Sequence, residues 1–266
     1  MISAGLLLVL TVAVLAACAP LFTDPLEVDV FNRLAAPNLA EPMGTDALGR
    51  DYLSRIAHGA QVSFTLAAVV VTFKILVGVL LGAAAGYAGR FVDGAISRMI
   101  DLFLALPSLI LALAIAAILG PSTVNVILAL VVVGWEGYAR LVRGAILTVK
   151  VAPWVESSRA IGCRRRTIVV RHVLPHVVAP LLVFAALDIG HTILAVAALS
   201  FLGLGVPPPT PEWGGMLAES TRFLETSPHL MIFPGLLILL SVLAFTLLGD
   251  GLRDRFDPRA KDTVVL

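Results

Sequence analysis

Long apolar runs alternate with short polar segments along this chain. The run 2–22 carries no charge, and the run 62–88 is interrupted only by Lys74. A helix needs about 20 apolar residues to cross the hydrocarbon core of a bilayer. Both runs are therefore predicted to be transmembrane helices, the first over residues 1–22.

The uncharged run 102–135 must be divided, because it is too long for one crossing and slightly short for two. The turn sequence Gly-Pro-Ser-Thr at 120–123 supplies the division. A third span is then expected to start near Ser97, and a fourth to continue past Glu136 towards Leu141. Glu136 itself is expected near the end of that span, where water reaches it.

Two further apolar runs, 180–204 and 230–248, bring the expected number of spans to six. Composition agrees, since only 14% of the 266 residues are charged and the mean hydropathy is +0.97, whereas soluble domains carry about 25% charged residues. The runs are also too long for membrane strands and do not alternate. The predicted fold class is an all-α polytopic membrane protein with six transmembrane helices.

Lysine and arginine lie mostly on one side of these spans. If the N-terminus is cytoplasmic, 14 of the 19 fall in inside segments, four fall in outside loops, and one, Lys74, is within a span. The positive-inside rule therefore predicts that both termini are cytoplasmic. The expected divisions are an extracytoplasmic segment over 23–61, a transmembrane core over 62–250 with a cytoplasmic loop over 150–178, and a cytoplasmic tail over 251–266.

The extracytoplasmic segment contains charge pairs at helical spacing. Thr45 or Asp46 is expected to cap a short helix, in which Asp46 precedes Arg50 by four residues and Asp51 precedes Arg55 by four. These pairs indicate either a solvated surface helix or a docking surface for an external partner. The spacing alone favours the solvated helix.

Signatures of catalysis are absent from the sequence. It has no Walker-type nucleotide loop, no His-Glu-x-x-His and no Gly-x-Ser-x-Gly. His172 and His176 are four apart, but Pro175 lies between them and no acidic residue is near enough to complete a metal site. The chain is expected to be neither an enzyme nor a holder of a metal or cofactor. If transport uses ATP, another subunit hydrolyses it.

Three ionisable residues fall inside predicted spans. Lys74 lies near the middle of the second, and Asp188 and His191 share a face of the fifth. Such groups are costly in a membrane and are functional candidates by default. They either line a polar path or contact a polar substrate, or Lys74 pairs with an acid of another helix or subunit while Asp188 and His191 are satisfied internally. The sequence leaves both readings open.

The densest positive charge lies in the segment 156–175, ESSRAIGCRRRTIVVRHVLP. It can form a short helix with Glu156 in its first turn, where the helix dipole favours an acid, and Gly162 permits close backbone approach. Such a segment is either an ordinary positive-inside loop touching anionic lipid or a handle that a soluble partner can push.

This segment resembles the EAA loop of bacterial ABC importer permeases. Glu156, Gly162, Leu174 and Pro175 match that pattern, serines replace its two alanines, and His172 stands where isoleucine is usual. The resemblance implies a type I ABC importer permease fold with a cytoplasmic coupling helix. The residues that would contact an ATPase are Glu156, Ser157, Ser158, Arg159, Ala160, Gly162, Leu174 and Pro175.

Other segments narrow the resemblance to the dipeptide/oligopeptide/nickel permeases, C-type subunit. They are GTDALGRDYLSRIAHGAQVS, GWEGYARLVRGAIL, ALSFLGLGVPPPTPEWGGML and LLGDGLRDRFDPR. The resemblance implies a bacterial cell membrane protein that pairs with a second, homologous permease. It also implies two ABC ATPases, or a fused one, that hold ATP and Mg²⁺, and an extracytoplasmic binding protein. No nucleic acid is implied.

The expected cargo is a di- or oligopeptide, or a related solute such as a nickel chelate or haem. A secondary, proton-coupled transporter is the alternative, in which Lys74, Asp188 and His191 form a relay. Such carriers often contain inverted repeats, and none is evident in this sequence.

Overall fold

The computed structural model describes residues 2–164, 167, 171 and 173–256. The regular secondary structure of this part of the chain is helical, apart from one isolated β-bridge between Thr45 and Asp51. Its elements are α1 (Ile2–Ala17), η1 (Ala19–Leu21), α2 (Tyr52–Tyr87), α3 (Arg90–Leu104), α4 (Ser108–Leu119), α5 (Thr123–Gly134), α6 (Glu136–Lys150), α7 (Pro153–Ala160), α9 (Leu174–Phe201), α10 (Trp213–Ser220), η3 (Thr221–Phe223) and α11 (His229–Phe256).

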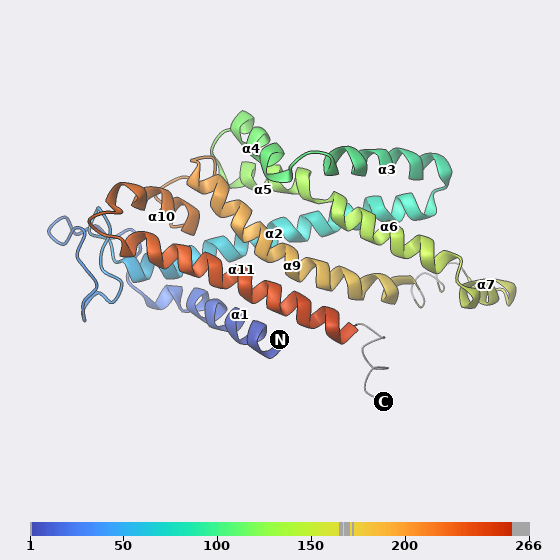
Figure 1. Cartoon of the computed structure of the whole chain (residues 1–266), viewed down its shortest axis with the longest axis horizontal. Helices are drawn as coiled ribbons and strands as arrows, with labels where there is room; N and C mark the ends of the chain where they lie inside the picture. Colours follow the sequence, from blue (N-terminus) through green and yellow to red (C-terminus); the bar gives the residue numbers. More distant parts are fainter. Residues whose placement is uncertain (1, 165–166, 168–170, 172, 257–266) are drawn as a thin grey trace.

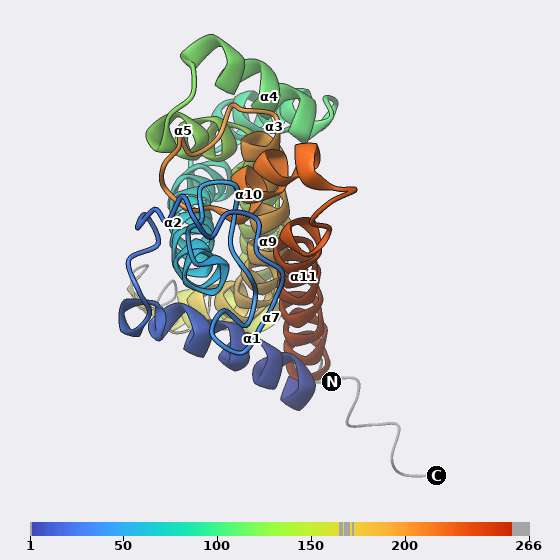
Figure 2. The ribbon, with the colours of Figure 1, turned by 90° about the vertical axis from the view of Figure 1, so that its left-hand side faces the viewer.

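The long helices run roughly along one axis of the molecule (Figure 1). Helix α11 packs between α9 and α1, and α2 packs against α6 and α9. Helices α3 and α4 lie on the side opposite α1, as the end-on view also shows (Figure 2). The loop before α2 and helix α10 lie at one end of the bundle, and α7 projects from the other. These ends are the outer and cytoplasmic ends in the predicted orientation.

Four helical stretches are long and apolar enough to cross a membrane, namely Tyr52–Tyr87, Thr123–Lys150, Pro175–Phe201 and His229–Phe256. Helices α3 and α4 make a fifth if the pair counts as one broken span. The first predicted span is α1, an apolar helix of only 16 residues. The structure therefore supports an all-helical membrane protein with four or five candidate spans, rather than the full six.

The third predicted span is not one straight helix. Helices α3 and α4 are bent by 89° at a short break. Pro107 precedes α4, and proline disfavours helical geometry in the residue before it, so α3 ends at Leu104. The predicted division at 120–123 is confirmed. Gly120 ends α4 with φ of 83°, and the Ser122 side chain caps α5 by accepting a bond from the amide of Val124.

Helix α2 begins ten residues before the predicted second span. The Asp51 side chain accepts bonds from the amides of Leu53 and Ser54, which makes Asp51 the N-cap. The predicted separate outer helix capped by Thr45 or Asp46 is therefore wrong. Both residues lie in the loop before α2, and residues 52–61 are the first turns of α2 itself.

Glycines permit the close contact between α2 and α6. A Cβ placed on Gly82 would lie 2.6 Å from the carbonyl oxygen of Ala139, and one on Gly86 would lie 2.6 Å from Cγ2 of Ile146. Small residues at this spacing let helix backbones approach each other in a membrane. This packing fixes the position of α6 against α2, and with it the side chains described next.

Candidate functional site

A lysine and an aspartate form an ion pair in the middle of the helical bundle. The Nζ atom of Lys74 on α2 lies 3.2 Å from both carboxylate oxygens of Asp188 on α9. Lys74 also donates to Oγ1 of Thr192 at 3.0 Å, and the Tyr138 hydroxyl donates to Asp188 Oδ2 at 2.9 Å. Burial of the unpaired ions would be costly, so each charge is stabilised by the other and by neutral hydroxyl groups.

The local sequence explains this geometry. Asp188 and Thr192 are four residues apart, so they lie one turn apart on the same face of α9. The ring of Tyr138 packs edge-on against Phe184 of α9, with centroids 4.7 Å apart. Gly134 leaves room for the lysine, because a Cβ there would come within 2.9 Å of Lys74 Cδ and Nζ. A side chain at position 134 would displace the lysine.

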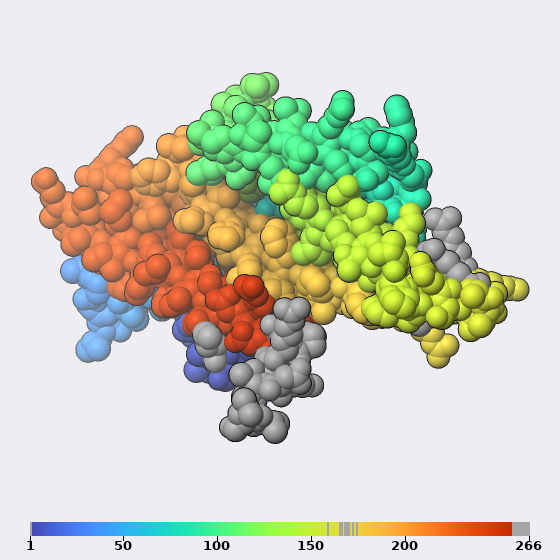
Figure 3. All heavy atoms as spheres, turned by 45° about the vertical axis from the view of Figure 1, so that its right-hand side comes forward, coloured from blue at the N-terminus to red at the C-terminus, as the bar shows by residue number. Residues whose placement is uncertain are grey.

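The ion pair lies in the wall of a cavity of about 500 Å³. The cavity is bounded mainly by α4, α5 and α9, and its wall is largely apolar, with Leu109, Val133 and Phe184 among the residues. In the space-filling view the molecule is hollowed between the green α3–α4 pair and the gold α9 (Figure 3). Its size is within the range of roughly 300–1,000 Å³ typical of small-molecule sites.

The structure brings the three predicted pathway residues to this one cavity. Lys74, Asp188 and His191 all belong to its wall. His191 is exposed and lies one helical turn from Asp188. Lys74 thus pairs with an acid of another helix, as one of the two interpretations held, and the pair borders an open cavity. A role of these residues in a polar path stays a prediction.

Glu136 is a wall residue that the sequence prediction misplaced. It was expected near water at a span end, yet it is only 7% exposed and lines the same cavity. The prediction ended the fourth span near Leu141, whereas the candidate span runs from Thr123 through α6 to Lys150. Glu136 is thus near its middle.

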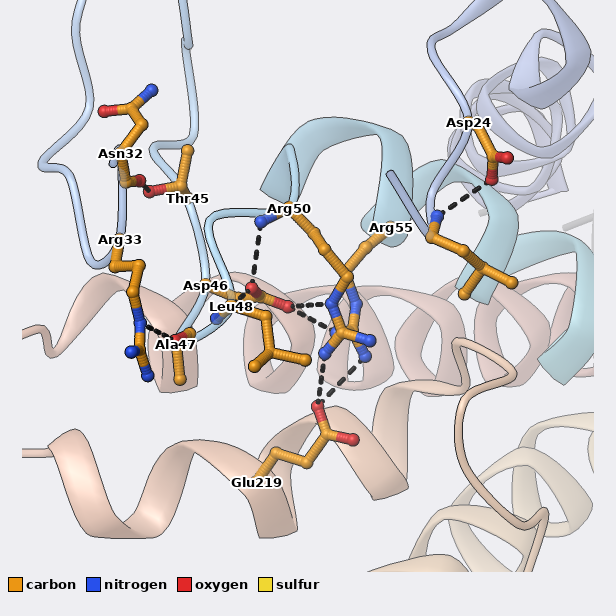
Figure 4. Close-up of polar contacts among 11 residues, drawn as sticks. Asp24, Asn32, Arg33, Thr45, Asp46, Ala47, Leu48, Arg50, Arg55 and Glu219 are labelled. Carbon is orange, nitrogen blue, oxygen red and sulfur yellow. Dashed lines mark hydrogen bonds and ion pairs between the residues drawn. The ribbon is translucent and has the colours of Figure 1, made fainter. Parts of the chain in front are cut away.

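The outer charged residues form a network inside the protein. Arg50 Nε lies 2.6 Å from Asp46 Oδ2, and Arg55 pairs with the same oxygen (Figure 4). Arg55 also lies 3.0 Å from Oε2 of Glu219 on α10. Burial is the largest influence on Glu219 and raises the pKa of its carboxyl above the ordinary value, while Arg50 opposes this rise.

This network changes the interpretation of the four candidate docking residues. Asp46, Arg50 and Arg55 are buried, with Arg55 only 1% exposed, and Asp51 caps α2. Their contacts hold the loop before α2 against α10 instead of presenting charge to solvent. Glu219 was missed because it is 164 positions from Arg55, and no local pattern links the two.

The predicted cytoplasmic handle is a helix, α7, at the far end of the bundle (Figure 1). Glu156 is exposed, and the Ser157 and Ser158 hydroxyls donate back to the carbonyls of Pro153 and Trp154. Val155 on the opposite side is fully buried in an apolar cluster with α6 residues. One side of α7 is thus anchored, and the other carries exposed polar groups.

Gly162 follows α7 with φ of 81°, a conformation that glycine adopts readily. Arg165, Arg166 and His172 lie outside the described residues. Pro175 stands in the first turn of α9, which begins at Leu174, six residues before the predicted fifth span. The ring of His176 stacks on Trp154 with centroids 6.0 Å apart, so α7 contacts the start of α9.

In residues 2–164, 167, 171 and 173–256, no group of three or more His, Cys, Asp or Glu side chains is arranged to hold a metal ion.

The chain is similar in sequence to known components of membrane transport systems. The sequence pattern of the family described as "Binding-protein-dependent transport system inner membrane component" matches residues 78–262. The "Dipeptide transport system permease protein DppC" of Alkalihalophilus pseudofirmus is 42% identical over 97% of this chain and 85% of its own length. The "Di/tripeptide transport system permease protein DppC" of Pseudomonas aeruginosa is 47% identical over 83% of this chain and 73% of its own length.

A third relative is the "Glutathione transport system permease protein GsiD" of Pectobacterium atrosepticum, 44% identical over 87% of this chain and 77% of its own length. Among solved structures, a chain of the inward-facing "MetNI methionine ABC transporter" aligns with a TM-score of 0.58 at 20% identity, covering 76% of this chain and 96% of that one. A chain of "an amino acid ABC transporter with histidines" aligns with a TM-score of 0.57 at 16% identity, covering 78% and 95%. At these identities the two structures support the fold alone.

Proposed function

The chain belongs to the family of binding-protein-dependent transport system inner membrane components, and we propose that it is a permease subunit that carries di- or oligopeptides into the cell. The assignment of peptides as the substrate class rests on the 42% identity, over 97% of the chain, to a dipeptide transport permease. Glutathione, the cargo named for another relative, is itself a small peptide. A nickel chelate or haem is the alternative substrate.

The cavity beside Lys74 and Asp188 is proposed to be this chain's share of the translocation path. It is open, and its wall combines apolar surface with a few charged groups, as small-molecule sites usually do. A second, homologous permease would complete the path from the other side. An extracytoplasmic binding protein would deliver the peptide at the end that carries α10.

Helix α7 is proposed to be the coupling helix. Its exposed side carries Glu156, and Gly162 directly beyond it allows close approach of a partner backbone. Two ABC ATPase subunits would hold ATP and Mg²⁺ and seat α7 in a surface groove. Because α7 is anchored through Val155 to the cluster around α6, movement of the ATPases would be transmitted to α6 and thus to the cavity wall.

Uptake by the reconstituted transporter tests this function. The chain, its companion permease and the ATPases would be placed in liposomes with the binding protein, and uptake of labelled alanyl-alanine would be measured. We expect uptake to require ATP and the binding protein, and to survive collapse of the proton gradient. Uptake driven by the proton gradient without ATP would overturn the proposal in favour of a secondary transporter that uses Lys74, Asp188 and His191.

A further inference from the structure

The wall of the cavity carries one carboxyl group that forms no ion pair within the described part of the protein. The charge of Lys74 is matched by Asp188 at 3.2 Å. Glu136 belongs to the same wall, and no ion pair within the described residues involves it. Its Oε2 atom is buried and has no hydrogen-bond partner there.

Such an arrangement is costly unless a ligand completes it. A carboxylate that is more than nine-tenths buried loses most of its hydration, and the loss is not recovered without a donor or a cation. Lys74 is the neighbouring cation, but its hydrogen bonds go to Asp188 and Thr192. It therefore does not donate a hydrogen bond to the Glu136 carboxylate. The site is therefore suited to a ligand that brings its own positive charge.

The shape of the wall around Glu136 also suits a small ligand. Gly134 and Gly137 lie close to Glu136 in the sequence and line the cavity, where their lack of side chains lets Lys74 and Phe184 approach the wall. Phe184 of α9 approaches Gly137, where a Cβ would lie 2.8 Å from its ring Cζ. The apolar part of a ligand would contact Phe184, Val133 and Leu109 while a cationic end reached the carboxylate.

We propose that Glu136 binds the ammonium group of a substrate in transit and thereby selects for peptides with a free, positively charged amino end. This inference rests on the proposed peptide transport function. An ammonium group has three donors, and its hydrogen bonds to a carboxylate are charge-assisted and stronger than neutral ones. The Lys74–Asp188 pair then serves as a neutral, polar part of the same wall.

Matched variants in the complete reconstituted transporter test the proposal. Glu136→Gln keeps the size of the side chain and removes its charge, and Glu136→Asp keeps the charge. Because the binding protein captures the peptide first, we expect Glu136→Gln to lower the maximal uptake rate of alanyl-alanine about tenfold with little change in the half-saturating concentration. Glu136→Asp retains most of the rate, and Glu225→Gln, at an exposed glutamate outside the cavity, retains all of it.

Substrate protection separates binding from a structural role. A carbodiimide that modifies buried carboxyl groups would be applied to the wild-type transporter, and modification of Glu136 would be followed by mass spectrometry. Alanyl-alanine delivered by the binding protein should slow that modification at least fivefold.

The proposal for Glu136 is overturned if Glu136 is modified equally with and without the peptide, or if Glu136→Gln takes up peptide at the wild-type rate. Neither result contradicts the proposed peptide transport function. Failure of the wild-type transporter to take up any di- or oligopeptide overturns both.

Discussion

Lys74 and Asp188 are 114 positions apart in the sequence, and yet the lysine Nζ lies 3.2 Å from each oxygen of the aspartate. The contact joins α2 to α9 beside the cavity. It therefore has two expected consequences, one for the stability of the helical bundle and one for transport.

Removal of one partner should expose the stability consequence. Asp188→Asn leaves the buried Lys74 without its counter-ion, and breaking a buried pair in this way costs about 3–5 kcal/mol. We expect a clear fall in the unfolding temperature of the purified complex. Tyr138→Phe, which removes only one neutral donor to the same carboxylate, should cost about 1 kcal/mol.

The double variant Lys74→Met/Asp188→Leu separates stability from transport. It replaces the pair by apolar groups and should recover most of the lost stability. If the pair borders the translocation path as proposed, peptide uptake by this variant stays low even though the complex is stable. Wild-type uptake would show that the pair is structural alone.

The outer network should behave as an internal support. Arg55→Met removes a fully buried cation and leaves Asp46 and Glu219 with one arginine between them. We expect a loss of about 3 kcal/mol in stability, measured as thermal unfolding of the complex. Arg222→Met, at an exposed arginine nearby, should change stability by less than about 0.5 kcal/mol.

The close contact between α2 and α6 gives a prediction about packing. Gly82→Leu would force its side chain into the backbone of Ala139, where even a Cβ would lie 2.6 Å from the carbonyl oxygen. Overpacking of this kind costs about 1–3 kcal/mol or more, and should lower the amount of assembled complex. Gly144→Leu on the open face of α6 meets no atom within 4 Å at its Cβ, and is expected to assemble normally.

Much of this architecture follows from local sequence. The apolar runs predict α2, α9 and α11, because a long and mainly apolar run has few alternatives to a helix in a bilayer. The turn at 120–123 and helix α7 also follow from local signals, namely Gly120, Ser122 and the charged segment after Pro153.

The missed features depend on distant contacts or on competition between nearby signals. Pro107 breaks an apolar run whose hydropathy gives no sign of the 89° bend. Asp46 Oδ1 accepts bonds from the amides of Leu48 and Arg50, but Gly49 has φ of 80° and no helix continues there, so the cap of α2 is Asp51. Glu136 and Glu219 acquire their roles only when helices remote in sequence surround them.

Helix α7 is proposed to join this permease to ATPase subunits, and that interaction can be measured directly. The tagged chain would be extracted in a mild detergent from its native membrane, and its companions would be identified by mass spectrometry. The wild type should recover a second permease together with subunits that carry a Walker motif. Glu156→Lys and Gly162→Asp should lose the ATPases and all peptide uptake while remaining inserted in the membrane. Recovery of the chain without ATPases, with uptake continuing in the absence of ATP, would contradict the claim.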